Sequence, residues 1–272
     1  MSFKSSSPKI RRPHLFPLLS ILLLLSAFTL LLVSLLTAPN SSSLSIYTLT
    51  ATVTPSRTKP AGSEINYIRL DLGLLGYCQF TDADVPWYTH PVGCYGSKTG
   101  YNIRNVIRGV NNNLRGVSAR QTNQWMDLTR GFVLPAVAAA CVGIAMLLLI
   151  LGEWVQYLHR IKSFLNITAW VFTFLGMVFS VAGMGCVISL IQKIKKTTWS
   201  SNGMVSIWTN MKTTEGIRYT YQYRLRQWYG AGTWTLVVAC ALLVLAVGVL
   251  GFTVVKERRA TRKKNLRVEG KA

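Results

Sequence analysis

Four long apolar stretches, separated by polar segments, dominate the pattern of this chain. They cover residues 15–38, 131–152, 164–191 and 231–255, and none contains a charged side chain. A bilayer core is crossed by about 20 mostly apolar helical residues, because an α-helix satisfies its backbone hydrogen bonds internally. The pattern therefore predicts four transmembrane helices. The first is longer than the apolar core of a secretory signal, so we interpret it as an uncleaved anchor.

The polar segment after the first apolar stretch has a different periodicity. Apolar and polar positions alternate over residues 45–53, which are rich in β-branched side chains, and again over residues 67–72. A period of two is typical of a half-buried strand, and we predict that these two strands pair as a small antiparallel sheet. Apolar positions at helical spacing in residues 103–114 predict a short amphipathic helix on this sheet or on the bilayer surface.

Cysteine placement bears on the same segment. Three of the five cysteines lie in the apolar stretches, and only Cys78 and Cys94 lie in an aqueous region. An isolated pair in an extracytoplasmic loop favours a disulfide, which contributes roughly 3 kcal/mol for a loop of this size. Two free thiols are the alternative. A metal site is disfavoured, because His90 is the one nearby imidazole and the spacing fits no zinc pattern.

Positive charges at the ends of the apolar stretches predict the orientation in the membrane. Lys and Arg are concentrated before the first stretch, between the second and third, and after the fourth, and such clusters face the cytoplasm. Lys193, Lys195 and Lys196 follow the third stretch on the predicted outer side and oppose this orientation. Basic residues are denser in the predicted cytoplasmic segments. We predict cytoplasmic termini (1–14 and a basic tail, 256–272), transmembrane helices at 15–38, 131–152, 164–191 and 231–255, a cytoplasmic link (153–163), and extracellular loops at 39–130 and 192–230.

The formal net charge of +21 raises the question of partners. Lys and Arg neutralise phosphates in nucleic-acid complexes, but here they are spread over both membrane faces. We therefore expect the lipid bilayer as a partner and no nucleic acid. We predict that the basic tail binds anionic inner-leaflet lipid, at about 1 kcal/mol per basic residue; a topology signal alone is the alternative. Small residues one helical turn apart, such as Gly176 and Ser180, favour close helix packing, within the bundle or in a homo-oligomer.

The second outer loop is rich in Trp and Tyr interleaved with Arg. Such side chains favour the membrane–water interface, and we interpret them in this way. The alternative is a docking surface for lipid headgroups or for a partner in an apposed membrane, for which Trp208 and Trp228 are the test positions.

A short motif in the first loop resembles that of a known family. It consists of Gly73, Leu74, Leu75, Gly76, Tyr77 and Cys78, followed by Cys94. The chain is similar in this motif to the fungal claudin-like four-span proteins, in particular to the mating-factor-induced calcium-regulator and membrane-fusion group. The resemblance implies an all-α four-transmembrane-helix bundle in the plasma membrane, with a small disulfide-closed extracellular β-rich module. The two glycines permit a tight turn or a close backbone approach.

The chain also resembles a second fungal group, the cortical-patch (eisosome) and pH-response four-span proteins. This likeness lies in Gly76, Tyr77 and Cys78, and in Tyr101 after its preceding glycine. Two features depart from the expected pattern, since Tyr95 stands where a serine is expected and the outer loop is longer than in the second group. We therefore favour the first group.

The first resemblance implies a role in calcium influx and membrane fusion during mating or cell contact, with calcium channel subunits or a homo-oligomer as partners. The second implies a cortical-patch organiser or a component of a pH-response sensor. No carboxylate lies within a span, whereas ion pathways commonly use intramembrane acids. Calcium ligands would have to be carbonyls or loop acids such as Asp71, Asp82 and Asp84, so we expect a regulator or scaffold of calcium entry rather than a pore.

Enzymatic activity is not expected. His14, His90 and His159 lie beside or between different spans, which leaves no imidazole cluster for acid–base or metal chemistry, and no phosphate-binding glycine loop or zinc-protease motif is present. We expect no cofactor. Asn40 begins a glycosylation sequon on the predicted outer side.

Overall fold

The architecture comes from a computed structural model. It describes residues 15–36, 44–55, 66–81, 93–96, 101, 126–154, 159–198, 206–212 and 218–269. The predicted amphipathic helix at 103–114, Asp82, Asp84 and Asn40 lie outside these residues.

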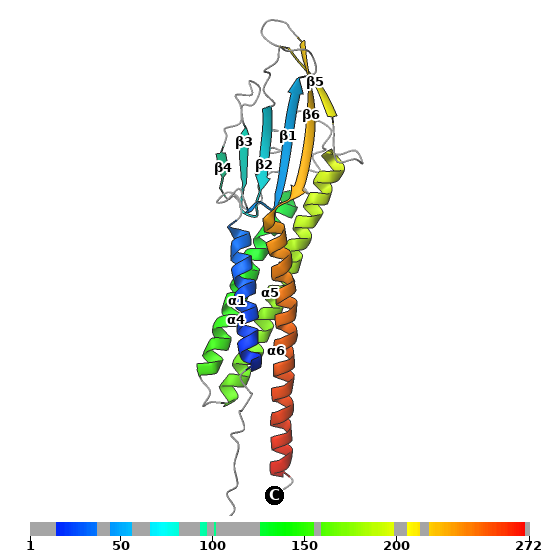
Figure 1. The fold of residues 1–272 in the computed structure, drawn as a ribbon. Helices are drawn as coiled ribbons and strands as arrows, with labels where there is room; N and C mark the ends of the chain where they lie inside the picture. Colours follow the sequence, from blue (N-terminus) through cyan, green and yellow to red (C-terminus); the bar gives the residue numbers. More distant parts are fainter. Residues whose placement is uncertain are drawn as a thin grey trace, which may run out of the picture.

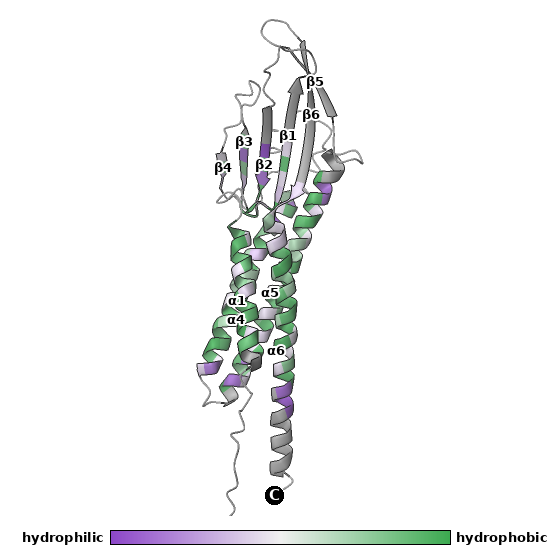
Figure 2. Ribbon diagram, viewed as in Figure 1, coloured by the Kyte–Doolittle hydropathy of each residue, from purple (hydrophilic) through white to green (hydrophobic). Residues whose placement is uncertain are grey.

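Four helices form an elongated bundle (Figure 1). They are α1 (Leu15–Leu35), α4 (Leu134–Trp154), α5 (His159–Thr198) and α6 (Ala231–Glu269). Helix α1 packs against α4 and α6, and α5 packs against the same two helices from the other side. All four are long and apolar enough to cross a membrane, and Figure 2 shows the hydrophobic band that they share. The prediction of a four-helix membrane bundle is confirmed.

Glycines set the distance between α4 and α5. A Cβ atom on Gly176 would lie 2.9 Å from a methyl group of Val142, and one on Gly183 would lie 2.7 Å from the ring of Pro135. Small residues let helix backbones approach closely in a membrane. Gly176, a residue of the pattern that we also considered for a homo-oligomer, therefore packs within the bundle.

A six-stranded antiparallel sheet stands on one end of the bundle, opposite the C-terminal end of α6 (Figure 1). Its strands are β1 (Tyr47–Pro55), β2 (Asn66–Leu72), β3 (Tyr77–Thr81), β4 (Gly93–Tyr95), β5 (Ser206–Lys212) and β6 (Arg218–Tyr229). The spatial order is β4-β3-β2-β1-β6-β5. The predicted pairing of the first two strands is confirmed, with Tyr47 opposite Leu72 and Val53 opposite Asn66.

The sheet is larger than the sequence analysis predicted, because the second loop contributes two of its strands. Strand β6 pairs with β1 along the whole of β1, from Tyr47↔Tyr229 to Pro55↔Tyr221, and it pairs with β5 on its other edge. We had interpreted the aromatic and arginine residues of this loop as membrane-interface residues. Their alternation over residues 218–229 has a period of two, which is the pattern of a strand.

Two helices extend past the ends of their neighbours. Helix α5 has 40 residues and α6 has 39, about twice the length that a bilayer core needs. The C-terminal turns of α5 continue up to the sheet, and the C-terminal turns of α6 continue beyond the opposite end of the bundle (Figure 1). The first extension positions the sheet, and the second places basic residues beyond the hydrophobic band.

Candidate functional site

The candidate site is the junction where the sheet meets the bundle. Helix α6 begins there directly after β6, beside the chain that enters β1. The backbone N–H of Gly230 donates to the carbonyl of Ile46 at 2.8 Å, and that of Gly232 donates to the carbonyl of Ser45 at 3.1 Å. The hydroxyl of Thr233 also donates to the Ile46 carbonyl, at 2.7 Å. Donors at the start of a helix have no partner within the helix, so Ser45, two residues before β1, supplies one for Gly232.

Only glycine fits at position 230. A Cβ atom there would overlap the carbonyl group of Ser45, which belongs to the backbone and has no free rotation away from it. The close approach of the two chain segments therefore depends on the missing side chain. This contact joins the start of the first outer loop to the end of the second.

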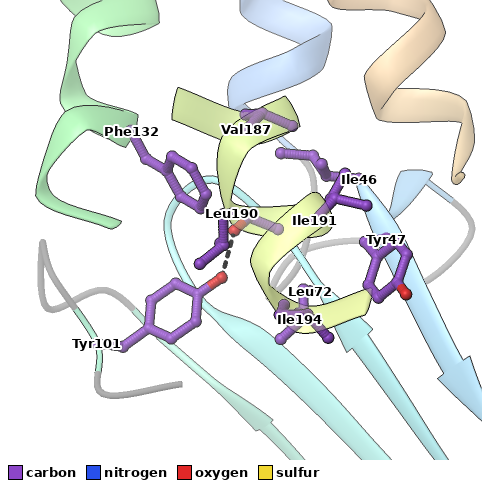
Figure 3. Close-up of a pocket in the computed structure, with 10 residues that line it drawn as sticks. Ile46, Tyr47, Leu72, Tyr101, Phe132, Val187, Leu190, Ile191 and Ile194 are labelled. Atoms are coloured by element: carbon purple, nitrogen blue, oxygen red, sulfur yellow. Dashed lines mark hydrogen bonds between the residues drawn. The ribbon is translucent and has the colours of Figure 1, made fainter. Parts of the chain in front are cut away.

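The last turns of α5 form an apolar seat for the sheet. Val187, Leu190, Ile191 and Ile194 are each at most 3% exposed. They line a small apolar cavity together with residues of β1, β2 and Phe132 from the turn η3 (Gly131–Val133), as Figure 3 shows. Burial of such side chains contributes about 1.5–3 kcal/mol each. The sheet is thus attached to the bundle by an apolar core as well as by backbone hydrogen bonds.

The glycine motif forms the turn between β2 and β3. The N–H of Gly73 donates to the carbonyl of Gly76 at 2.8 Å, and Leu74 is buried at 3% exposure. The phenol of Tyr101 donates to the Gly73 carbonyl at 2.9 Å (Figure 3). The hydroxyl of Thr129 donates to the Met126 carbonyl at 2.8 Å and also lies within hydrogen-bond distance of the Tyr101 carbonyl, at 3.2 Å. Tyr101 therefore connects the motif to the helical segment that precedes α4.

Tyrosines cluster around this turn. The ring centroid of Tyr77 lies 5.1 Å from that of Tyr95 and 5.7 Å from that of Tyr101, within the range of favourable aromatic pairs. Burial raises the pKa of Tyr101 above its usual range, and the neighbouring Tyr77 raises it further. Burial also raises the pKa of Tyr47, with a smaller contribution from Tyr229. The sequence analysis named Tyr101 only for a resemblance and missed its hydrogen bond to the motif.

The predicted disulfide between Cys78 and Cys94 is present and joins β3 to the short edge strand β4. The two cysteines are directly opposite in the register, and Cys78 is also opposite Asp71 of β2. Gly93, which precedes the second cysteine, has a φ of +151°, a conformation that glycine adopts more readily than other residues. The disulfide therefore fastens an edge strand of three residues to the sheet.

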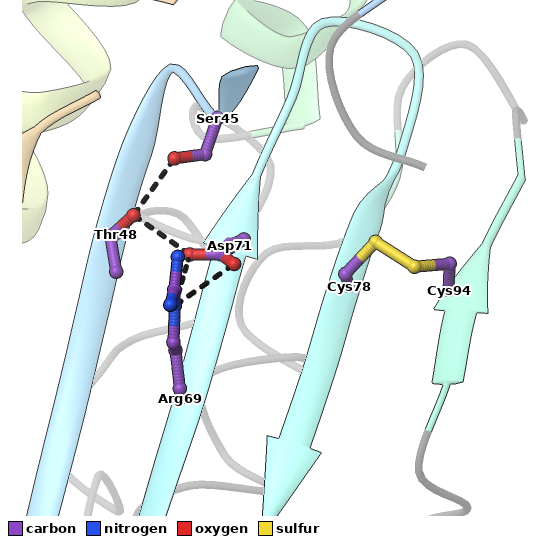
Figure 4. Close-up of polar contacts among 6 residues, drawn as sticks. All are labelled: Ser45, Thr48, Arg69, Asp71, Cys78 and Cys94. Carbon is purple, nitrogen blue, oxygen red and sulfur yellow. Dashed lines mark hydrogen bonds and ion pairs between the residues drawn. A yellow bond between two sulfur atoms is a disulfide. The ribbon is translucent and has the colours of Figure 1, made fainter. Parts of the chain in front are cut away.

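Asp71 is the centre of a buried polar network (Figure 4). Its side chain is fully buried, and its Oδ1 accepts a hydrogen bond from Thr48 at 2.7 Å and one from Arg69 Nε at 3.0 Å. Arg69 Nε is also 3.0 Å from Oδ2. Since the Thr48 hydroxyl donates to Asp71, Ser45 donates to Thr48, at 2.8 Å. A buried carboxylate is costly unless it is paired and hydrogen-bonded, and this network provides both.

The network engages Asp71 unevenly: Oδ1 accepts both hydrogen bonds, whereas Oδ2 lies 3.0 Å from Arg69 Nε and accepts no hydrogen bond. Of the three loop acids considered above, Asp71 is paired with Arg69, so it is not a free calcium ligand. Within the described ranges, no three His, Cys, Asp or Glu side chains come together as a possible metal site.

Exposed aromatic side chains near the junction bear on both interpretations of the second loop, as membrane-interface residues or as a docking surface. Trp228 and Tyr229, at the end of β6, are 46% and 43% exposed, and Trp234 in the first turns of α6 is 62% exposed. Exposed Trp and Tyr at the end of a membrane helix are typical of the interfacial belt. This cluster marks the depth at which the sheet begins.

Comparison with known proteins assigns the architecture to a family. The sequence model of the SUR7/PalI family matches residues 16–247, a range that contains the sheet, the disulfide and all but the C-terminal part of the bundle. No curated protein matches the chain.

Proposed function

Because this chain belongs to the SUR7/PalI family, a fungal claudin-like four-span membrane family, we propose that it is a non-conducting plasma-membrane scaffold. In this role it regulates calcium influx and membrane fusion during mating or cell contact. Its bundle holds the sheet at a fixed height above the bilayer, and the sheet is the part that meets other proteins. The chemistry of this function is binding and positioning, without catalysis.

The observation that carries the proposal is the closed, uncharged interior of the bundle. The four apolar stretches contain no charged residue. Buried hydroxyls are satisfied inside the bundle: Ser34 donates to the Leu31 carbonyl at 2.7 Å, Thr173 donates to the Ala169 carbonyl at 2.8 Å, and Ser180 lies 3.1 Å from Cys240 Sγ. Calcium needs six to eight oxygen ligands. Hydroxyls that already bond within the bundle do not provide them.

The proposed orientation places the sheet outside the cell and both termini in the cytoplasm. A disulfide persists in oxidising compartments, and one lies in the sheet. The hydrophilic turns in the C-terminal part of α6, which contain Lys256, Arg258 and Arg259, lie at the end of the bundle opposite the sheet (Figure 2), as the positive-inside rule requires. A glycan on Asn40 would agree with this orientation, and one on Asn166 would contradict it.

Two measurements test the proposal together. The purified protein in liposomes should not pass calcium, and fungal cells that lack it should show reduced calcium uptake during mating or cell contact. Wild type should restore this uptake, and the Cys78→Ser, Cys94→Ser variant should not, at matched surface levels. Calcium flux through the protein alone would overturn the scaffold role, whereas uptake independent of the protein would remove calcium from its function.

The second candidate is an organiser of cortical membrane patches or a component of a pH-response sensor. The family description fits this group as well as the first. The apolar seams within the bundle also favour a structural role that needs no ion. Patch morphology in cells lacking the protein separates the two candidates: altered patches with normal calcium uptake would favour the organiser.

A further inference from the structure

The C-terminal end of α6 extends beyond the bundle. A contact between α5 and α6 aligns the two helices and so gives the length of this extension. The indole N–H of Trp170 on α5 donates to the carbonyl of Val247 on α6 at 3.3 Å, beside Gly251. Lys162 pairs with Glu153 at 3.0 Å at the end where the apolar stretches of α4 and α5 stop, and it precedes Trp170 by eight residues. Because the two helices are antiparallel, this end is level with residues 255–259 of α6.

Ten or more residues of α6 therefore continue past the level of this ion pair before the helix ends at Glu269. At a rise of 1.5 Å per residue, they extend about 15–20 Å. Figure 1 shows this segment in line with the rest of α6, with no other helix beside it.

The extension is strongly basic along its whole length. Residues 256–269 contain seven basic residues and two acidic ones. The basic ones are Lys256, Arg258, Arg259, Arg262, Lys263, Lys264 and Arg267. Four of them recur at intervals of three or four, at positions 256, 259, 263 and 267, which places these positions on one face of a helix. Arg258 and Arg259 are exposed.

Electrostatic attraction to the bilayer does not reach the whole extension. The surface potential of an anionic leaflet falls off within a Debye length, which is about 8 Å at physiological ionic strength. Arg258 and Arg259 lie at the level of the bundle end, where lipid phosphates attract them. Arg267 lies about 12–18 Å further along the helix axis, so lipid does not hold it while the helix stays upright.

We propose that the distal turns of α6, residues 263–269, form a docking helix for an acidic segment of a cytoplasmic protein. The partner carries carboxylates at helical spacing that match the basic face. A second copy of this chain does not fit, since its own extension is equally basic and like charges repel. This role goes beyond the scaffold function and rests on the proposed topology alone. It refines the prediction of lipid binding, which the proximal basic residues retain.

The test uses the full chain in lipid nanodiscs, where both faces are accessible, so its result depends on neither topology nor calcium. The probe is a fluorescent helical peptide with Glu at intervals of three and four, at physiological salt. One variant replaces Lys263, Lys264 and Arg267 with Gln, and the matched control replaces Arg258, Arg259 and Arg262 with Gln. Each removes three charges, and Gln keeps helix propensity, which circular dichroism checks.

We expect the distal variant to lose at least about tenfold in probe affinity, which corresponds to about 1.4 kcal/mol, and the proximal variant to lose less than about threefold. Wild-type binding should persist in discs enriched in phosphatidylserine. The proposal is overturned if wild type does not bind the probe or if both variants lose affinity equally. It is also overturned if phosphatidylserine abolishes binding, because the extension then lies on the lipid.

Discussion

Gly230 and Ile46 are joined by a backbone hydrogen bond of 2.8 Å, although they belong to the last and the first outer segments of the chain. Gly230 lies between the end of β6 and the start of α6, and Ile46 directly precedes β1. The bond makes this point a single structural unit, in which β1 and β6 pair above and α6 begins below. Stability of the sheet and attachment of the sheet to the bundle are therefore coupled.

Substitution of Gly230 by Ala should separate these segments. The new methyl group would overlap the Ser45 carbonyl, and relief of this overlap would break at least two hydrogen bonds of about 1 kcal/mol each. We expect a loss of more than about 3 kcal/mol, measured by thermal unfolding in detergent. Gly248→Ala is the matched control, since a Cβ atom there meets nothing within 4 Å and Ala favours a helix by about 1 kcal/mol.

Loss of the disulfide should loosen the β4 edge first. The Cys78→Ser, Cys94→Ser variant should lose about 3 kcal/mol and become sensitive to proteolysis in the outer segment. Cys141→Ala is the control, because this cysteine is free and lies in α4. Equal protease resistance of wild type and the double variant would contradict a stabilising role of the bond.

Alkaline pH should destabilise the junction. Burial raises the pKa values of Tyr47 and Tyr101 in the folded state, whereas an unfolded tyrosine titrates near 10. Their contribution is therefore complete below about pH 10 and is lost as pH rises toward the folded pKa values. Tyr101→Phe should cost about 1 kcal/mol at neutral pH, through the lost bond to Gly73, and should show a smaller alkaline loss than wild type in pH-dependent unfolding.

The Asp71 network should respond to charge removal and not to calcium. Asp71→Asn leaves Arg69, 39% exposed, without its buried counter-charge, and we expect a loss of about 1.5–3 kcal/mol. Added calcium or a chelator should leave the melting temperature of both proteins unchanged. A calcium-dependent rise for wild type that the variant lacks would show that this carboxylate binds the ion.

Sequence periodicity was sufficient for the parts of the fold that follow a simple repeat. The four spans are visible as uninterrupted apolar runs, and the first two strands are visible as alternation. The two outer cysteines were paired by elimination, since the other three lie in spans. These features depend on neighbours close in sequence or on composition alone.

Long-range pairing explains what the sequence did not reveal. The alternation of Tyr and Arg over residues 218–229 fits a strand, but aromatic residues beside a span fit the membrane interface as well. Only the register with β1 decides between them. The hydrogen bond of Tyr101 to Gly73 and the close contact at Gly230 are likewise contacts between distant segments, and no local pattern specifies them. The extension of α6 was missed because a basic tail after a span has the same composition whether it is helical or not.

The pairing of β1 with β6 also limits how this chain tolerates exchange of parts with its relatives. Each outer segment contributes one strand, β1 or β6, that pairs with a strand of the other segment, so neither is an independent module that can be grafted alone. A chimera that replaces only residues 44–101, or only residues 206–230, would meet a foreign register at the centre of the sheet. The two segments form one sheet, so an exchange that preserves the fold must include both.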